Sequence, residues 1–394
     1  MSRRNVIPVY ITAFGHFILE LCSNFLPIVY PLLIALLGLS YGQIGLIALV
    51  MGVGASVTQP LFGLWSDRWN PRVIASFGVI WTGVVLGLIG LAPSYWFVLL
   101  VVAVGGLGSA AFHPSGATIA YAGGGRRRGI AISIFSVGGN LGSALSPLLV
   151  ALTIGLWGLI GTTVVIPIGL AAGLFMYLWL RDDPKFPTSS VESEKDLQTT
   201  APSGWLLGLA LVVIAIMGRS WFQVALMTYL PTWMQEQGYS ITMGGQFLFV
   251  FSASAGAGSL VGGTLSDYVG RWSVLVVGLG FLGPVYWLYL NATGIAQLIV
   301  LLAVMGVLIG STFPVSIVLA QEVWPRGVGL ASSLVMGLGW APGGIAASLT
   351  GVLADSNSLD YALRWLIVAP VVGLAAILLF GLLRRRQDRL APGV

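Results

Sequence analysis

The amino-acid sequence predicts an all-α membrane protein with twelve transmembrane helices, arranged as two parallel six-helix repeats. The chain of 394 residues is 57% hydrophobic and only 8% charged, which is more apolar sequence than the core of a water-soluble protein of this length could bury. A similar phrase also occurs twice, 200 positions apart, at residues 63–68 (GLWSDR) and 263–268 (GTLSDY). Each copy ends a long apolar run, so the two halves of the chain are expected to fold alike.

Twelve apolar stretches, separated by short polar turns, have the length that a membrane-spanning helix requires. A helix needs about 20 apolar residues to cross a hydrocarbon core of roughly 30 Å. The stretches are about twice as long as a barrel strand and lack its two-residue alternation, which favours a helical bundle. We expect the spans at residues 6–35, 42–63, 72–91, 95–122, 128–152, 157–180, 204–233, 241–265, 273–292, 295–320, 326–353 and 360–383.

The sixth and seventh spans are separated by the one long polar segment of the chain. Residues 181–203 are rich in Ser, Thr, Glu, Asp and Lys, a composition typical of a solvated linker. We therefore expect an N-terminal six-helix bundle at 1–180, a cytoplasmic linker at 181–203 and a C-terminal six-helix bundle at 204–394. The first span is too long for the apolar region of a cleaved signal peptide and is retained as a helix.

Basic residues are expected on one side of the membrane. All of the 18 Lys and Arg residues except Arg219 and Arg364 fall in the loops and termini that share a side with the chain ends. The positive-inside rule therefore predicts that both termini are cytoplasmic. The net charge of +5 follows from this topology and does not indicate a nucleic-acid partner.

Asp67 and Asp267 occupy the two copies of the repeated phrase, in the loops after the second and eighth spans. Two sets of six spans with an acidic motif in these loops resemble the major facilitator superfamily, over essentially the whole chain. The resemblance implies that these loops help to latch the cytoplasmic side, where an acid beside a helix N-terminus gains about 0.3 to 1 kcal/mol. The gating residues that it implies are Asp67, Arg68, Asp267, Arg271, Glu322 and Arg326.

Rarer motifs occur in order along the chain. They are His16, 30–33 (YPLL), 59–60 (QP), 112–114 (FHP), 123–129 (GGGRRRG), 133–142 (SIFSVGGNLG) and 320–322 (AQE). This set resembles the fosmidomycin resistance branch of the superfamily. The resemblance implies a monomeric exporter in the bacterial inner (plasma) membrane, which exchanges protons for a small phosphonate drug. Such a transporter is driven by the proton gradient and needs no cofactor.

His16 and Glu20 are four residues apart, so they share one face of the first helix near the membrane midplane. A charged group there costs at least roughly 2.5 to 3.5 kcal/mol and therefore needs a partner or a task. An imidazole beside a carboxylate can share a proton, which is what proton coupling requires. The alternative is a static polar pair that fixes helix packing. His113, beside the helix-kinking Pro114, is a third candidate for the proton or the substrate, or else a hydrogen-bonded packing residue.

Arg219 is expected well inside the seventh helix. A guanidinium stays charged and binds planar oxyanions through two parallel hydrogen bonds, so Arg219 is a predicted anchor for a carboxylate, phosphate or phosphonate. The alternative is a permanent ion pair with an acid such as Glu20. The predicted substrate-binding residues are Arg219, His16, His113, Asn140, Tyr30 and Tyr229.

These features favour a proton-coupled antiporter that exports a small anionic or phosphonate-type drug such as fosmidomycin by alternating access. A proton symporter that imports an organic anion or a sugar fits the same pattern, because direction is not encoded in it. A non-transporting membrane receptor is a more distant alternative. An enzyme is disfavoured, since the sequence has no metal-ligand spacing, no nucleotide-binding glycine loop and no catalytic triad, and its single cysteine, Cys22, stands alone.

Overall fold

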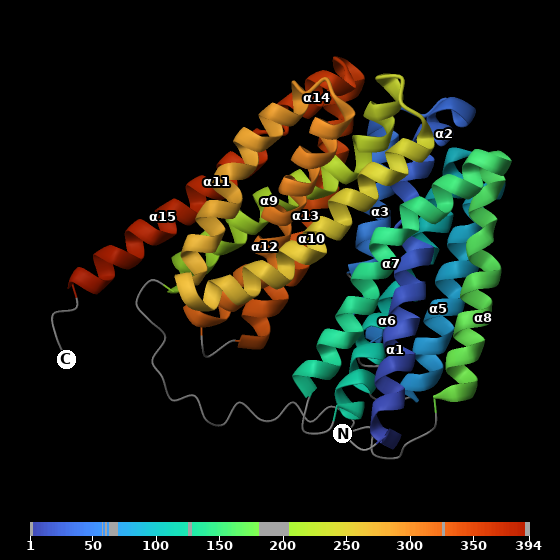
Figure 1. Cartoon of the computed structure of the whole chain (residues 1–394), viewed down its shortest axis with the longest axis horizontal. Helices are drawn as coiled ribbons and strands as arrows, with labels where there is room; N and C mark the ends of the chain where they lie inside the picture. The colour runs from blue at the N-terminus through green and yellow to red at the C-terminus, as the bar shows by residue number, and fades with distance from the viewer. Residues whose placement is uncertain are drawn as a thin grey trace. The chain divides into compact units, whose positions relative to one another are not determined.

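The computed structural model describes residues 3–56, 58–59, 61–62, 70–124, 128–180, 205–324 and 328–390. These residues form helices joined by short turns, and no strand occurs in this part of the chain (Figure 1). The predicted linker at 181–203 and the predicted gating residues Asp67, Arg68 and Arg326 lie outside the described residues.

The described helices of the two halves follow in chain order. Those of the first half are α1 (Arg3–Ser23), α2 (Leu26–Leu37), α3 (Tyr41–Ser56), α5 (Pro71–Gly87), η1 (Leu88–Leu91), α6 (Tyr95–Gly123), α7 (Arg128–Trp157), η3 (Gly158–Val164) and α8 (Val165–Trp179). Those of the second half are α9 (Trp205–Glu236), α10 (Ile241–Val269), α11 (Arg271–Leu290), α12 (Ile295–Val323), α13 (Val328–Ser356), α14 (Leu359–Trp365) and α15 (Val368–Leu390).

Length and composition identify 9 candidate membrane spans within the described residues. The longest, Ile130–Trp179, runs over 50 residues and contains both α7 and α8, whereas α3 is a shorter apolar helix. Every one of the expected spans overlaps at least one described helix. The all-helical membrane architecture is therefore confirmed. The number of twelve spans and their arrangement as two six-helix repeats stay predictions.

One expected span contains a break that hydropathy does not reveal, and a second break lies near an expected span boundary. The chain leaves α1 at Asn24 and enters α2 at Leu26, with Pro27 in the first turn, where a missing N–H is tolerated. At the start of the expected span 157–180, Gly158 has a φ of 66°, a backbone conformation that favours glycine, and η3 precedes α8. The break at Asn24 lies in apolar sequence, so α1 and α2 together have the hydropathy of one long span.

The chain divides into two compact units. Unit 1 comprises Met1–Glu192 and Thr228–Phe249, and unit 2 comprises Ser193–Met227 and Val250–Val394. The division falls inside α9 and α10, because the end of α9 and the start of α10 belong with the N-terminal helices. One hydrogen bond within unit 1 illustrates this, since the Tyr229 hydroxyl of α9 donates to the carbonyl oxygen of Tyr41 at 2.9 Å.

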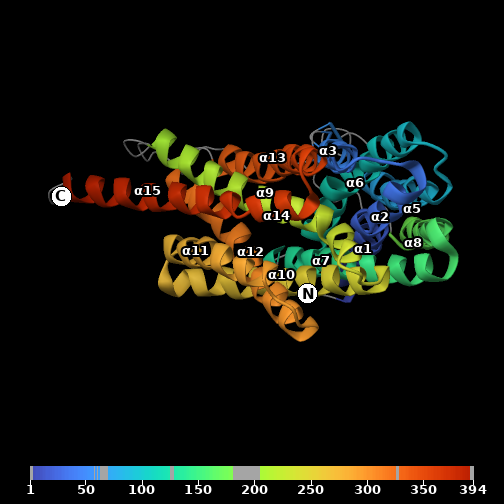
Figure 2. The same cartoon turned by 90° about the horizontal axis from the view of Figure 1, so that it is seen from above.

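α1 is the central helix of unit 1. It packs against α5, α6, α7 and α8, which run beside it (Figures 1 and 2). Its contact with α7 is made close by glycines, because a Cβ at Gly138 would clash with the carbonyl oxygen of Ala13, and one at Gly142 with that of Phe17. We call this contact of Gly138 and Gly142 with Ala13 and Phe17 the glycine seam.

Unit 2 is organised around an apolar core shared by α9, α11, α12, α13 and α15. Its buried side chains include Leu209, Val212, Ile216, Leu275, Leu279, Leu319, Val335, Ile377 and Phe380. Lipid tails are as apolar as these side chains, so close van der Waals packing stabilises this core more than the exclusion of water does.

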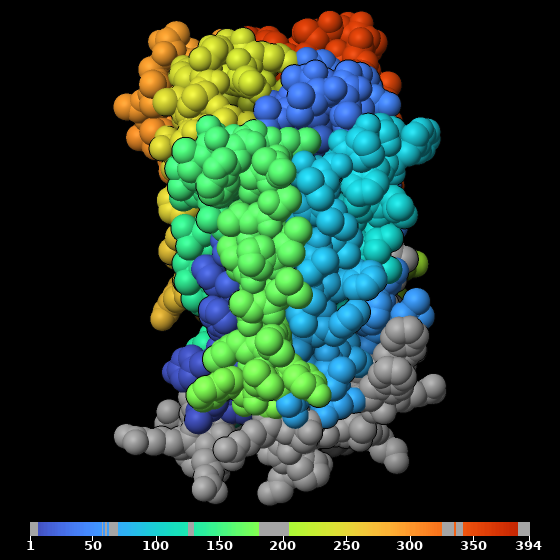
Figure 3. Space-filling view, turned by 90° about the vertical axis from the view of Figure 1, so that its right-hand side faces the viewer, coloured from blue at the N-terminus to red at the C-terminus, as the bar shows by residue number. Residues whose placement is uncertain are grey.

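The outer surface of α8 is apolar. Leu174, Leu178 and Trp179 are each more than half exposed. Figure 3 shows α8 beside α5 on this face of unit 1. Helices that satisfy their own backbone hydrogen bonds and expose apolar side chains are what a lipid-facing surface requires.

Candidate functional site

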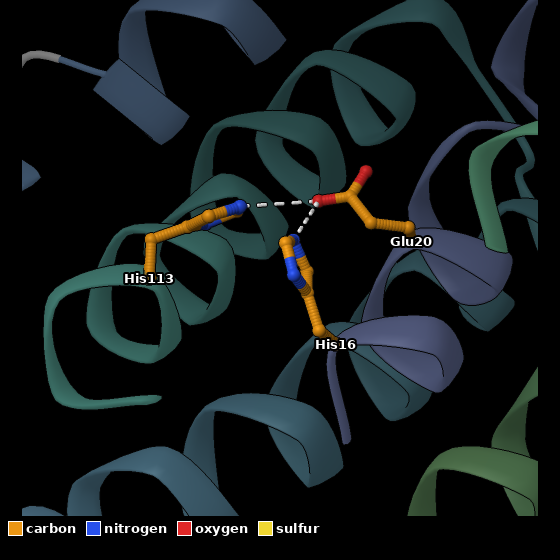
Figure 4. A group of neighbouring side chains, drawn as sticks. All are labelled: His16, Glu20 and His113. Atoms are coloured by element: carbon orange, nitrogen blue, oxygen red, sulfur yellow. Dashed lines mark ion pairs between the residues drawn. The ribbon is translucent and has the colours of Figure 1, made fainter. Parts of the chain in front are cut away.

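Three of the predicted residues meet in unit 1. His16 and Glu20 lie one turn apart on α1, and His16 Nε2 is 3.6 Å from Glu20 Oε1. The third residue, His113, comes from α6, and its Nε2 is 3.1 Å from the same carboxylate oxygen. Figure 4 shows both rings directed at the carboxylate. We call these residues the His-Glu-His cluster.

The two imidazole rings are each held by a backbone carbonyl. Nδ1 of His16 lies 2.9 Å from the carbonyl oxygen of Phe135, and Nδ1 of His113 lies 2.8 Å from that of Ser109. A carbonyl oxygen can only accept, so Nδ1 carries the proton in both rings. In the neutral form each ring therefore directs the bare lone pair of Nε2 at Glu20.

The second oxygen of Glu20 is also hydrogen-bonded. Asn24 Nδ2 donates to Oε2, and Ser143 Oγ of α7 donates to it at 3.1 Å. Neither residue was singled out in the sequence. Asn24 could have been identified from the sequence, because it lies four residues after Glu20 on the same helix face. Ser143 could not have been identified in this way, since only the packing of α7 on α1 brings it to the cluster.

The walls of the cluster are apolar and close. The His16 ring stacks on Phe135 with the ring centroids 4.2 Å apart, and it lies 5.7 Å from the ring of Phe112. Gly139 of α7 leaves the room for this ring, because a Cβ there would clash with its imidazole atoms. The exposed fractions of the side chains are 11% for His16, 15% for Glu20 and 29% for His113. His113 is therefore the most accessible part of the cluster.

This arrangement is suited to holding a positive charge. With Glu20 ionised and both rings neutral, three acceptors converge and repel one another. A proton shared between the carboxylate and one ring turns this repulsion into a charge-assisted hydrogen bond. Gaining or losing that proton changes the charge of the cluster by one, at a place shielded from water.

Arg219 is the buried charge of unit 2. Its side chain is on α9 and the residue is 4% exposed. Nε lies 3.2 Å from Thr312 Oγ1 and 3.4 Å from the carbonyl oxygen of Ile309, and the guanidinium lies 5.0 Å from the centre of the Phe313 ring. Within the described part of unit 2, no carboxylate pairs with Arg219.

Part of the hydrogen-bonding capacity of Arg219 is unused within the described residues, and apolar side chains surround the residue. Nη1 is buried and has no hydrogen-bond partner among the described residues. On the same helix, buried Ser220 Oγ and Gln223 Oε1 are also without partners in that part of the chain. Gln223 lies one turn after Arg219, a spacing that could have identified it in the sequence. A pocket here is lined by Val212, Ala215, Ile216, Arg219, Leu275, Leu279, Thr312 and Ser316.

Part of the predicted gating network is present in unit 2. Arg271, the first residue of α11, donates to the carboxylate of Asp267, and its Nε donates to Glu322 Oε1 at 3.3 Å. Arg271 Nη1 also donates to Ser266 Oγ at 2.7 Å. The acid of the second repeated phrase and the acid of α12 thus share one arginine.

The other three predicted substrate residues have separate environments. Tyr30 is buried in α2. Tyr229 is buried in α9, and its hydroxyl donates a hydrogen bond to the carbonyl oxygen of Tyr41. Asn140 is exposed on α7. Their roles toward a substrate stay predictions.

A family model described as the Major Facilitator Superfamily matches residues 12–295 and 248–393, which together span almost the whole chain. The Fosmidomycin resistance protein of Escherichia coli (strain K12) is 28% identical over 373 residues, which cover 93% of this chain and 90% of that protein. The Uncharacterized MFS-type transporter YfnC of Bacillus subtilis (strain 168) is 32% identical over 390 residues, covering 92% and 90%.

The fold resembles solved structures over nearly the same length. A bacterial homolog to the human lysosomal transporter Spinster superposes with a TM-score of 0.81 at 16% identity, covering 96% of this chain and 97% of that one. The nucleoside transporter NupG superposes with a TM-score of 0.80 at 13% identity, covering 95% and 99%. At these identities the likeness concerns the fold.

Proposed function

Because the chain belongs to the major facilitator superfamily, it is a multi-pass membrane transporter of small molecules and not an enzyme, and we propose that it is a proton-coupled antiporter. Its substrate is a small anionic or phosphonate-type drug such as fosmidomycin, which it exports by alternating access. The observation that carries the proposal is the convergence of three acceptor atoms, from His16, Glu20 and His113, inside unit 1.

The proton is held by the His-Glu-His cluster. A proton that enters past His113 forms a hydrogen bond between Glu20 Oε1 and the Nε2 atom of one histidine. It either resides on the carboxylate and neutralises it, or is shared between the two groups. Its loss restores the negative charge of Glu20, which is then stabilised by Asn24 and Ser143 alone. The two protonation states therefore differ in the contacts that α1 makes with α6.

The anion is held by Arg219. Its charge is permanent and its Nη1 hydrogens are available within the described part of unit 2, so an oxyanion gains both Coulombic attraction and a hydrogen bond there. Gln223 supplies an amide on the same face of α9.

Alternating access in this proposal uses two six-helix repeats that make up twelve spans. A repeated contact supports them: a Cβ at Gly106 would lie 2.9 Å from the amide nitrogen of Ala55, and one at Gly306, 200 positions later, would lie 3.2 Å from that of Ala255. The Asp267–Arg271–Glu322 network latches the cytoplasmic side of the second repeat, with Asp67, Arg68 and Arg326 completing the gate. Both termini lie in the cytoplasm of a bacterial cell, the inner membrane holds the protein as a monomer, and the proton gradient alone supplies energy.

Reconstitution tests the proposal directly. Purified protein is placed in liposomes with a pH-sensitive dye inside, a proton gradient is imposed, and fosmidomycin or an unrelated lipophilic cation is added. We expect proton movement only when the phosphonate is added, and we expect substrate and proton to cross the membrane in opposite directions. Movement in the same direction would replace antiport by symport, and the absence of any substrate-triggered proton flux would contradict the proposed coupling. Asp360→Asn, in an exposed ion pair of α14, is the control variant.

A further inference from the structure

The His-Glu-His cluster has the donor geometry of a transition-metal centre. One donor atom from each of its residues lies within 4.8 Å of the others. Glu20 Oε1 is 3.1 Å from His113 Nε2 and 3.6 Å from His16 Nε2. A tetrahedral Zn²⁺ with bonds of about 2.0 to 2.1 Å places its ligand atoms about 3.3 Å apart. We propose that His16, Glu20 and His113 form a Zn²⁺-binding site.

The contacts behind the three ligands are those that a zinc site needs. Ligating histidines usually donate their other ring N–H to a carbonyl or carboxylate, which fixes the ring and keeps the metal-facing nitrogen unprotonated. Both rings of the cluster do this, through the carbonyls of Phe135 and Ser109. The carboxylate is oriented in the same way, because its other oxygen accepts from Asn24 and Ser143.

The ligand set also fits the ion in charge and access. Two neutral imidazoles and one carboxylate leave Zn²⁺ with one uncompensated charge and one open position, which a hydroxide fills and neutralises. The 29% exposure of His113 gives the ion a route to the cluster. The sequence showed no metal-ligand spacing because α1 and α6 contribute the ligands from distant positions, and only the fold brings them together.

The metal and the coupling proton require the same lone pairs, so they exclude each other. This consequence rests on the proposed function: external Zn²⁺ at the cluster would block proton coupling. The binding site itself rests only on the geometry of the donors and their outer contacts.

The test uses the full-length protein in detergent, purified with a tag that contains no histidine. His16 and His113 are the 2 histidines of the chain, so a signal from imidazole ligands has no other source. ZnCl₂ is titrated by calorimetry, and CoCl₂ is added in a parallel experiment as a spectroscopic probe of the same site. We expect one ion per chain and the visible absorption of four-coordinate Co²⁺, which Zn²⁺ abolishes on addition.

Variants separate the site from adventitious binding. His16→Ala and His113→Ala should each remove the stoichiometric Zn²⁺ signal and the Co²⁺ absorption. Ser143→Ala leaves all three ligands in place and should weaken binding by about 10- to 100-fold, the usual effect of losing an outer-sphere contact. Asp360→Asn removes an exposed carboxylate and should change neither signal.

Two results would overturn the site. The first is wild-type protein, monodisperse by gel filtration, that shows neither stoichiometric Zn²⁺ binding nor a four-coordinate Co²⁺ spectrum. The second is a His16→Ala/His113→Ala double variant that binds Zn²⁺ as the wild type does. Proton-coupled transport without Zn²⁺ binding would remove this inference and keep the proposed function, whereas binding without such transport would do the reverse.

Discussion

In unit 1 the partly buried carboxylate of Glu20 contacts the side chains of His16, His113, Asn24 and Ser143. In unit 2 the buried guanidinium of Arg219 keeps one nitrogen without a partner among the described residues. The first charge can be removed by a proton and the second cannot. The two units therefore hold their charges in different ways, which agrees with the different roles proposed for them. A switchable, fully contacted charge suits energy coupling, and a fixed charge with a free donor suits an anionic ligand.

The largest effect is expected from removing the titratable carboxylate of Glu20 while Arg219 is left unchanged. In Glu20→Gln the side-chain amide can donate to the Nε2 lone pairs and so imitates the protonated carboxylate. We expect substrate transport driven by a proton gradient to fall by about 100-fold, near the upper end of allosteric coupling between sites. Exchange of labelled for unlabelled substrate, without a gradient, should persist. Proteoliposome uptake measures both, and gradient-driven transport at the wild-type rate would contradict the role of Glu20.

Removing the fixed charge should affect binding instead. Truncating one partner of a buried charged contact costs about 2 to 5 kcal/mol, so Arg219→Met should weaken substrate binding by about 30-fold or more. The same change should leave the thermal stability equal or higher, because a buried charge without an acid partner is replaced by a side chain that suits its apolar surroundings. Calorimetry and a thermal-unfolding assay measure the two effects. A marked loss of stability would indicate that Arg219 is structural.

A smaller effect is expected from displacing the His16 ring without replacing any residue of the His-Glu-His cluster. Gly139→Ala adds a Cβ that clashes with the His16 ring, so we expect a loss of about 1 to 3 kcal/mol of stability together with weaker coupling. Gly52→Ala of α3 is the matched control, since nothing lies within 4 Å of a Cβ there. It should be neutral or stabilise the protein by up to about 1 kcal/mol. Equal effects of the two variants on coupling would show that the position of the ring is unimportant.

The smallest effect is expected where charge is exposed. Asp360 and Arg364 form a pair on α14 with an Nε to Oδ2 distance of 2.8 Å, and both side chains are more than 40% exposed. Water screens such pairs, so Asp360→Asn should cost about 0.3 to 0.5 kcal/mol and leave transport unchanged. Thermal unfolding measured in low and high salt checks this, because the difference between wild type and variant should shrink as salt rises.

Much of the fold could be predicted from hydropathy, because a helix must be long and apolar to cross the bilayer. The break at Asn24 could not, since it lies inside apolar sequence, whereas the turn at Gly158 falls within a few residues of the expected boundary between the spans 128–152 and 157–180. The contact of Arg271 with Asp267 was expected from the superfamily resemblance, and the structure contains it, while its role in gating stays a prediction.

The cluster was only partly predictable. His16 and Glu20 follow from helical periodicity, but the approach of His113 depends on how α6 packs on α1. Asn24 and Gln223 could have been found by the same spacing of four, applied to Glu20 and Arg219. Ser143 depends on a contact across 123 positions, which a single sequence does not reveal.

The glycine seam has a mechanical consequence. At Gly138 and Gly142 the two helices touch backbone to backbone, without a side chain of α7 between them at these two points. Interiors packed this closely transmit strain and do not absorb it. We therefore expect α1 and α7 to move as one rigid body, so that in the proposed mechanism a proton bound at the His-Glu-His cluster would displace both helices together.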